Sequence, residues 1–380
     1  MKKKNIKMGM LGFGSMGKTH SYAISNFKFF MKELPFSVVL SGVCTTSLEK
    51  SQAVANEFGF EFGTDCPDDI ITAPDIDVVD ICTPNIYHYD ALKKAILAGK
   101  HIYCEKPLCV SYAQAKEIAE LAEKSGKIHN IVFNNRFLAP IQRAKQLIED
   151  NKLGRILSFN VSYLHSSAVY TSKNAGWKQN KDICGGGVLF DLGSHVIDLI
   201  YHLCGQFDEV NTLTQIAYEK RAGMDGKPWK TNADEAFYMI AKLKNGACGT
   251  ITASKVAPGA NDDIILDIYG ENGSIKFSLM DCNWLHFYDN TLEDSALGGS
   301  KGYTKIECVG RYPEPQGVFP SPKASSGWLR GHISSMYNFI NSVYTGIQTS
   351  PSFSDGAYVQ AVMEAAYRSA ESRMWVKVED

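Results

Sequence analysis

Three glycines near the N-terminus constrain the fold of this chain more than any other feature. Gly12, Gly14 and Gly17 follow an apolar, strand-like segment at 6–11 and precede a segment at 18–34 with helical spacing. In such a pattern the glycines permit a tight turn, a close approach to phosphate and close packing of helix on strand. The helix N-terminus then favours negative charge. The pattern predicts a dinucleotide site formed by Gly12, Phe13, Gly14, Ser15, Met16 and Gly17.

The segments that follow alternate between strand and helix. The predicted strands lie at 37–43, 78–81, 101–103 and 127–133, and the helices between them at 47–58, 87–98 and 112–124. This βαβ alternation is typical of a parallel, doubly wound sheet, so we predict an α/β fold with a Rossmann domain over residues 1–134.

The pattern changes beyond residue 134. A helix, a strand at 155–164, a helix at 191–203 and then mostly strands up to about residue 287 predict an α+β domain with a large, mostly antiparallel open sheet. We assign residues 135–380 to this second domain. Residues 289–327 are rich in Gly, Ser and Pro, and we expect a long loop there.

Composition narrows the classes of partner. With 39 basic and 41 acidic residues, the chain has a net charge of −2, so bulk charge gives no argument for nucleic-acid or anionic-membrane binding. We expect no apolar run long enough to cross a bilayer. The ten cysteines form no Cys-x-x-Cys pair, which favours a reducing cytoplasm and no metal site. We expect a cytoplasmic protein with a small-molecule partner, and neither nucleic acid nor membrane.

The second strand ends at the position that reads the adenosine ribose of a dinucleotide. An NAD-selective site normally has an acidic residue there, whereas this chain has Thr45. Thr46, Ser47 and Lys50 offer donors to a 2′-phosphate, although no arginine is present. We predict that either NAD or NADP binds, that NADP is accepted, and that a preference for NADP is open. Alternatively, the hydroxyls only cap the following helix.

Polar residues follow two further strands, where ligands of open α/β sheets gather. Thr83, Pro84, Asn85 and His88 come after the fourth strand. Glu105, Lys106 and Pro107 come after the fifth, and the proline keeps Lys106 out of a helix. A lysine there can hydrogen-bond a substrate hydroxyl. The alternative is a solvent-exposed loop lysine.

Asp191 and His195 are four residues apart at the start of a predicted helix and share one face. A carboxylate beside an imidazole can fix its tautomer and stabilise its protonated form, as a proton acceptor requires. The glycines at 185–187 before the pair are expected to let backbone amides approach a ligand. A structural Asp/His contact is the alternative.

Taken together, these motifs resemble the Gfo/Idh/MocA family, the glucose–fructose oxidoreductase and inositol dehydrogenase family. The matching residues are the glycine pattern with His20, Thr83-Pro84-Asn85 with His88, Glu105-Lys106-Pro107, Trp177 before the glycine run, Asp191 with His195, and the ending at 352–370. The resemblance implies an NAD(P)-dependent oxidoreductase acting on a carbinol or carbonyl carbon of a sugar, cyclitol or related polyol. It also implies a homodimer or homotetramer formed through the second sheet.

By the same resemblance, Lys106, Asp191 and His195 form the catalytic group. Lys106 would polarise the reacting oxygen, His195 would pass its proton, and Asp191 would hold His195. Nucleotide contacts are expected from the glycine loop and from Thr45, Thr46, Ser47, Lys50, Thr83, Pro84, Asn85, His88, Glu105 and Lys106. Substrate contacts are expected from Lys106, Tyr163, His165, Trp177, Asp191, His195 and His332, with ordinary packing as the alternative for several of them.

Two other functions remain open from the sequence. A redox-neutral glycosidase of the same fold would oxidise a sugar transiently, eliminate the aglycone and reduce the sugar again with retained NAD. A non-catalytic, nucleotide-binding regulatory protein would not need Lys106, Asp191 and His195, which are all present.

Overall fold

The computed structural model describes residues 3–31, 33–223, 225–310, 312, 324–325 and 327–379, and the chain forms two compact units. Of the described residues, those within 3–134 and 329–360 belong to unit 1, and those within 135–312, 324–328 and 361–379 belong to unit 2. The first boundary lies at Asn134. The segment 329–360, which the sequence analysis assigned to the second domain, belongs instead to unit 1, because its apolar side chains pack into that core.

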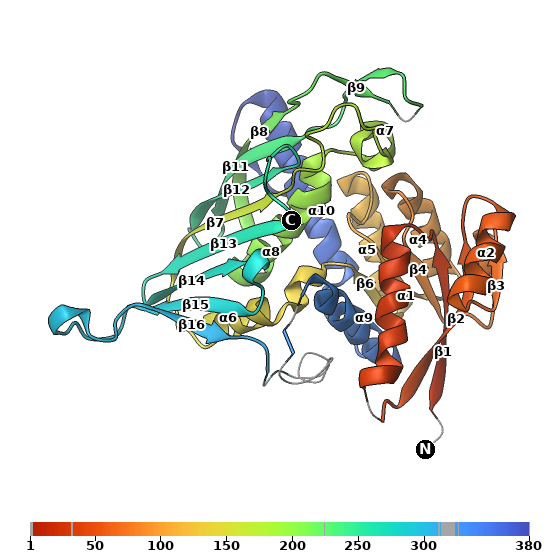
Figure 1. The fold of residues 1–380 in the computed structure, drawn as a ribbon, viewed down its shortest axis with the longest axis horizontal. Coiled ribbons are helices and arrows are strands. Elements are labelled where there is room, and N and C mark those ends of the chain that lie inside the picture. The colour runs from red at the N-terminus through yellow and green to blue at the C-terminus, as the bar shows by residue number, and fades with distance from the viewer. Residues whose placement is uncertain are drawn as a thin grey trace. The chain divides into compact units, whose positions relative to one another are not determined.

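Unit 1 is built on a six-stranded sheet with the order β3-β2-β1-β4-β5-β6, in which all pairs are parallel. The strands are β1 (Lys4–Leu11), β2 (Phe36–Cys44), β3 (Phe62–Thr64), β4 (Val78–Ile81), β5 (His101–Cys104) and β6 (His129–Ile131). The helices are α1 (Ser15–Phe30), α2 (Leu48–Phe58), α3 (Asp68–Ile71), α4 (His88–Leu97), α5 (Tyr112–Ser125) and α9 (Trp328–Thr345) (Figure 1). The predicted doubly wound Rossmann fold is confirmed.

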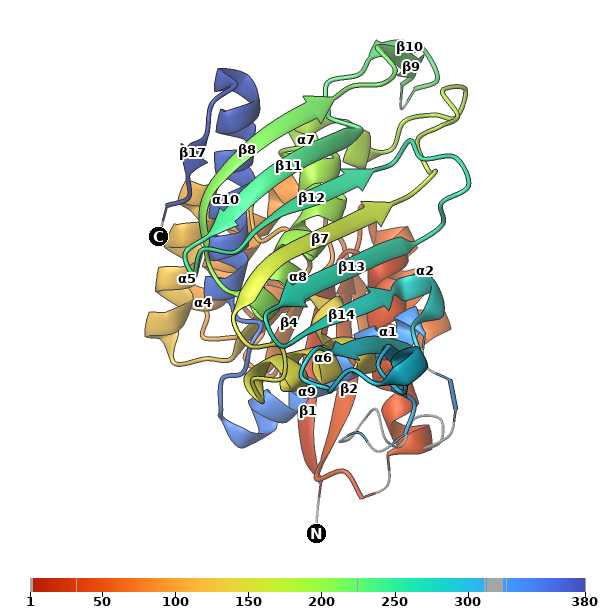
Figure 2. The same cartoon turned by 90° about the vertical axis from the view of Figure 1, so that its left-hand side faces the viewer.

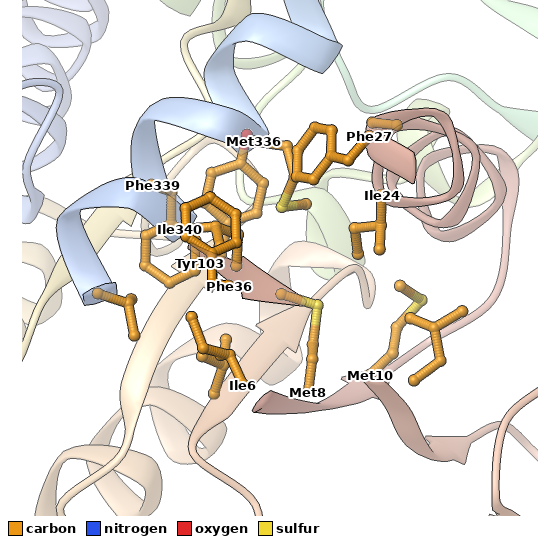
Figure 3. Close-up of a cluster of buried hydrophobic side chains, with 14 of the residues drawn as sticks. Ile6, Met8, Met10, Ile24, Phe27, Phe36, Tyr103, Met336, Phe339 and Ile340 are labelled. Atoms are coloured by element: carbon orange, nitrogen blue, oxygen red, sulfur yellow. The ribbon is translucent and has the colours of Figure 1, made fainter. Parts of the chain in front are cut away.

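The core of unit 1 joins the first strand to a helix more than 300 residues later in the chain. Figure 3 shows side chains of β1, α1 and α9 meeting in one buried cluster. Its labelled members are Ile6, Met8, Met10, Ile24, Phe27, Phe36, Tyr103, Met336, Phe339 and Ile340. Most are fully buried, and burying a side chain of this size stabilises the fold by roughly 1.5–3 kcal/mol.

The register of the central strands brings the predicted motifs to one edge of the sheet. Leu11, the last residue of β1, pairs with Ile81 at the end of β4, which pairs with Cys104 at the end of β5. The glycine loop, the Thr83 loop and the Lys106 loop therefore leave three adjacent strands at the same level. The strand order reverses between β1 and β4, where ligands of such sheets bind.

Unit 2 is built on a nine-stranded sheet with the order β16-β15-β14-β13-β7-β12-β11-β8-β17. Its strands are β7 (Ile156–Leu164), β8 (Phe207–Gln215), β11 (Ala236–Leu243), β12 (Cys248–Ser254), β13 (Asp263–Gly270), β14 (Gly273–Ser278), β15 (Trp284–Asp289), β16 (Tyr303–Glu307) and β17 (Val376–Lys377). β7 and β12 run parallel and the other pairs are antiparallel, as predicted. β9 (Lys220–Ala222) and β10 (Pro228–Lys230) form a separate hairpin.

The predicted loop at 289–327 is wrong in part. Residues 303–307 form β16, which pairs with β15, because cross-strand pairing stabilises a segment that shows no periodicity of its own. Residues 311, 313–323 and 326 of that loop lie outside the described part of the chain.

One face of the unit 2 sheet carries helices. They are α6 (Ala139–Glu149), α7 (Lys181–Cys184), a π-helical turn at Leu189–Gly193, α8 (Ser194–Cys204) and the C-terminal half of α10 (Phe353–Ser372). Figure 2 looks onto the opposite face, with α8 and α10 behind the strands. The expectation that no apolar segment is long enough to cross a membrane needs correction. The stretch Lys181–Cys204 is long and apolar enough by composition, but 83% of its apolar window is buried, as in the core helix of a folded domain.

Candidate active site

The three glycines of the loop after β1 have the separate steric roles that a dinucleotide site requires. Gly12 has a φ of 88°, and a Cβ there would lie 2.7 Å from the Cys82 carbonyl oxygen. A Cβ on Gly17 would lie 2.7 Å from the carbonyl oxygen of Gly12. At Gly14, by contrast, a Cβ would meet nothing within 4 Å, so this glycine faces open space. The loop therefore leaves room for phosphate at its second glycine.

The N-terminus of α1 is also suited to a phosphate. Its N-cap, Gly14, provides no side-chain cap, and the first turn has no acidic residue. Near this turn, the buried Thr83 Oγ1 lacks a hydrogen-bond partner among the described residues. Phe13 packs against Phe58, with ring centroids 4.8 Å apart, so it supports the loop from inside. These features fit a bound dinucleotide, which would be held by amides of residues 14–17.

The threonine at the end of β2 is engaged within its own loop. The Thr45 amide donates to Ser51 Oγ at 3.0 Å, and the Thr45 and Ser51 hydroxyls are 2.8 Å apart. Ser47 Oγ accepts from the Lys50 amide at 3.3 Å and caps α2. The capping interpretation thus accounts for Thr45 and Ser47. Thr46 and the Lys50 side chain remain exposed.

His88 connects two loops of the sheet edge. It is fully buried, its Nδ1 lies 3.0 Å from the Pro107 carbonyl oxygen, and its Nε2 lies 2.9 Å from that of Thr83. Burial lowers the pKa of His88, so the ring is neutral and its tautomer selects which carbonyl receives the hydrogen bond. The predicted direct contact between His88 and the nucleotide is not supported, because both ring nitrogens face protein carbonyls.

Glu105 points into the protein. Its carboxylate is 3.3 Å from His20 Nε2 and accepts the Lys106 amide hydrogen bond at 3.2 Å. The Glu105 carboxylate therefore contacts protein groups, and this position does not support its predicted contact with the nucleotide. The carboxylate is 9% exposed, whereas Lys106 is partly exposed.

In unit 2, Asp191 lies between two lysines. Lys178 Nζ is 2.8 Å from one carboxylate oxygen, and Lys255 Nζ is 2.9 Å from the other. Lys178 is half-exposed and stands 5.7 Å from the Trp177 ring, whereas the Lys255 side chain is only 10% exposed. Sequence analysis missed Lys255, because it follows β12 without any motif and only the fold brings it to Asp191.

A second polar group, formed by Tyr163, His165 and Asp262, lies beside His195 of α8. The Tyr163 hydroxyl donates to Asp262 Oδ1 at 2.6 Å, and His165 Nε2 lies 2.9 Å from the same oxygen. The Tyr163 ring centroid is 6.0 Å from that of His195. Burial raises the pKa of Asp262, but the bonds from His165 and Tyr163 outweigh this effect and lower it overall. The structure thus gathers four of the predicted residues (Tyr163, His165, Asp191 and His195) around Asp262 and Lys255, and Trp177 adjoins Lys178.

The glycine run at 185–187 serves packing. The Gly187 amide donates to Asp234 Oδ1 and the Leu189 amide to Asp234 Oδ2, each at 2.9 Å. A Cβ on Gly187 would lie 2.1 Å from the Asp234 carbonyl oxygen. The amides of Gly185 and Gly187 therefore do not face a ligand as predicted, because the Lys181 carbonyl oxygen and the Asp234 carboxylate already accept their hydrogen bonds.

His332 is not part of the unit 2 group. It lies on α9 in unit 1, is 3% exposed, and its ring centroid is 6.2 Å from that of His20. The sequence does not reveal that the helix carrying His332 packs into the core of unit 1. The role of His332 as a substrate contact has no support from this position.

His20, Asp80 and Cys82 also meet the distance requirement for a metal site. Their ligand atoms lie within 4.8 Å of one another. The pairs are already hydrogen-bonded, however, because His20 Nδ1 is 3.0 Å from Asp80 Oδ2 and 3.2 Å from Cys82 Sγ. Hydrogen bonds therefore account for the short distances between these three side chains without a metal ion.

Two family models cover most of the chain. A Gfo/Idh/MocA model described as an oxidoreductase family with an NAD-binding Rossmann fold matches residues 6–133. A second, described as the C-terminal alpha/beta domain of the oxidoreductase family, matches residues 145–378.

Several relatives are sugar dehydrogenases. Levoglucosan dehydrogenase of Pseudarthrobacter phenanthrenivorans is 31% identical, covering 99% of this chain and 98% of that protein. Glucose-6-phosphate 3-dehydrogenase of Bacillus subtilis is 25% identical, covering 94% of each. A solved structure of levoglucosan dehydrogenase with NADH and levoglucosan has a TM-score of 0.94 and 31% identity, covering 99% of this chain and 100% of that one.

Proposed function

This chain belongs to the Gfo/Idh/MocA oxidoreductase family, and we propose that it oxidises or reduces one carbinol or carbonyl carbon of an unphosphorylated sugar or anhydrosugar. It is an NAD(P)-dependent dehydrogenase, and the nicotinamide supplies the hydride acceptor or donor when bound. The choice of an unphosphorylated substrate rests on the relative that matches over 99% of the chain, a levoglucosan dehydrogenase. The redox-neutral and regulatory alternatives are not favoured by these relatives.

We assign the chemical roles as follows. Lys106 donates a hydrogen bond to the reacting oxygen, and His195 accepts the carbinol proton during oxidation. Asp191 maintains the electrostatic environment of His195, and the ammonium groups of Lys178 and Lys255 hold the Asp191 carboxylate in place. The two ammonium groups offset the negative charges of Asp191 and Asp262, so the group does not repel the anionic character that an alcohol acquires as its proton leaves.

The observation that carries this proposal is the unit 2 group. A carboxylate fixed at both oxygens, a buried imidazole and the Tyr163–Asp262–His165 cluster lie on the side of the sheet that carries α8. Hydroxyl-bearing ligands are recognised by such donors and acceptors. The open glycine loop of unit 1 supplies independent support for the nucleotide.

The assay that tests the function follows the reduced-nicotinamide absorbance band. Purified protein receives NAD or NADP together with levoglucosan, a methyl glucoside, glucose 6-phosphate, xylose, myo-inositol or an aryl glycoside. We expect net formation of reduced cofactor, first with levoglucosan. Aryl release without net reduction would contradict a dehydrogenase, and a preference for glucose 6-phosphate would contradict the unphosphorylated class.

The same assay decides the nucleotide. We propose that both nucleotides are accepted, because no carboxylate at the end of β2 repels a 2′-phosphate and because Thr46 and Lys50 are exposed there. The expected kcat/KM values for NAD and NADP differ by less than about tenfold, or ~1.4 kcal/mol. A larger advantage of NAD would contradict the proposal.

We further propose that the chain forms a homodimer or homotetramer through the open face of the unit 2 sheet. Leu213, Tyr238 and Ile265 belong to one cross-strand row that also includes Thr252 and Ser162. Ile240 lies in the next row, and these four large side chains are 42–64% exposed. Several large apolar side chains exposed on one sheet face are typical of subunit interfaces.

An Ile240→Asp substitution tests that interface. The added carboxylate would have to be desolvated between subunits, so we expect a smaller species in analytical ultracentrifugation and a folded protein by circular dichroism. Leu97→Asp is the matched control, because Leu97 is 75% exposed on α4 in unit 1. An unchanged sedimentation coefficient for Ile240→Asp would exclude this face.

The cysteines support a cytoplasmic location, which we also propose. All ten are free thiols, and six of them are buried. Free thiols persist in a reducing compartment.

A further inference from the structure

Unit 1 contains a buried row of ionisable side chains, Asp80, His20 and Glu105, that the proposed chemistry does not use. It begins at Asp80 on β4, passes through His20 on α1 and reaches Glu105 after β5. Asp80 Oδ2 is 3.0 Å from His20 Nδ1, and His20 Nε2 is 3.3 Å from Glu105 Oε1. The other Glu105 oxygen accepts from the Lys106 amide at 3.2 Å.

All three side chains are buried. His20 is 1% exposed, Asp80 is fully buried and Glu105 is 7% exposed. The Tyr103 ring lies 5.2 Å from the His20 ring and stacks on Phe339 at 4.9 Å. The path therefore runs through a dry interior, where charges interact strongly and an uncompensated charge is costly.

Electrostatic interactions connect Asp80, His20 and Glu105 to Lys106. Burial alone lowers the pKa of His20, but the charge of Asp80 outweighs it and raises the pKa well above the ordinary value. Burial likewise raises the pKa of Glu105, yet the close contact with His20 and the charges of His20 and Lys106 lower it to about 2. The positive charges of Lys106 and His332 both favour the ionised form of Glu105, and by reciprocity an ionised Glu105 favours the ammonium form of Lys106.

We propose that Asp80, His20 and Glu105 form a positioning relay that holds the Lys106 loop against α1 and keeps Lys106 as a hydrogen-bond-donating ammonium during the reaction. The inference rests on the proposed role of Lys106. Buried ion pairs are weak contributors to stability compared with apolar packing, so stability alone does not account for three ionised groups in this core. Their connection to the Lys106 amide, through Glu105, explains why these groups are buried here.

Glu105→Gln and His20→Gln test the relay. Glu105→Gln keeps the shape of the side chain but removes the charge that favours the Lys106 ammonium. We expect kcat to fall by about tenfold or more, with KM for the nucleotide changed by less than about threefold. We also expect the alkaline limb of the kcat–pH profile to move to lower pH. Beyond His20, the titratable groups that interact with Glu105 are Lys106, His88, His332, Cys82, Tyr103 and Cys104, and none of these is replaced in the two variants.

Lys100→Met is the matched control for loss of a buried charge in unit 1. The Lys100 ammonium bonds to the carbonyls of Ala73 and Ile76 beyond the opposite end of β5. This variant should lose thermal stability while keeping kcat and its pH profile. The same result for Glu105→Gln and His20→Gln would overturn the relay.

A double-mutant cycle separates the relay from general damage. In a Lys106→Met background, His20→Gln should cause little further loss, because the relay acts through Lys106. An equal loss in both backgrounds would overturn the proposal. If Lys106→Met itself retained kcat, the role of Lys106 would fail and the relay with it. A Lys106→Met variant that is inactive beside fully active relay variants would overturn the relay alone. Stoichiometric zinc in the purified protein would also overturn it, since His20 Nδ1 would then be a ligand.

Discussion

Replacing Lys106 with methionine lowers kcat by at least about 10²-fold while the dissociation constant of the nucleotide stays nearly unchanged. Methionine keeps much of the aliphatic bulk and removes the ammonium that, in the proposed mechanism, hydrogen-bonds the reacting oxygen. Interactions that strengthen only in the transition state appear in kcat, whereas uniform binding appears in KM. Steady-state rates and a fluorescence titration with reduced nucleotide measure the two quantities separately.

Lys93→Met provides the matched control for Lys106→Met. Lys93 lies on α4 of the same unit, its side chain is 41% exposed, and its ammonium pairs with Glu117 at 2.8 Å. Exposed pairs of this kind contribute only about 0–1 kcal/mol, so kcat should stay within about twofold of the parent. An unchanged kcat in Lys106→Met would remove Lys106 from the mechanism.

Local sequence was sufficient for the parts of the site that depend on short-range constraints. Gly12 and Gly17 are required by backbone contacts that a Cβ would violate, and such requirements are visible in the spacing of the glycines. The parallel sheet also followed from alternation. β3 and α3, with three and four residues, are too short to show a hydrophobic period, and they were not predicted.

The rest of the site depends on pairings across long sequence separations. Lys255 reaches Asp191 because β12 ends beside the turn that carries Asp191, and Asp234 caps the Gly187 and Leu189 amides from a distant loop. Neither residue belongs to a motif. His332 shows the converse problem, since a histidine that sequence analysis placed near substrate lies in the core of unit 1.

Replacing His195 with glutamine has the other large expected effect. His195 is 8% exposed on α8, beside Tyr163 and one turn beyond Asp191. If His195 accepts the carbinol proton, oxidation requires its neutral form, and the rate rises with pH as that form accumulates. Glutamine retains hydrogen-bonding capacity but accepts no proton. We expect kcat for oxidation to fall by about 10²–10⁴-fold and the acid limb of the kcat–pH profile to flatten.

His202→Gln, on the same helix, separates this effect from simple loss of a histidine. Burial, followed by the charges of Arg136 and Lys145, lowers the pKa of His202 to about 3, so its ring is neutral over the whole assay range. Its replacement removes no titration between pH 5 and 9 and should leave both kcat and the acid limb intact. If the limb persists in His195→Gln, another group takes the proton. The Tyr163 hydroxyl is a poor substitute, because burial and then the Asp262 charge raise its pKa well above the ordinary value. His165, which contacts the same Asp262 oxygen, would then be the residue to replace next.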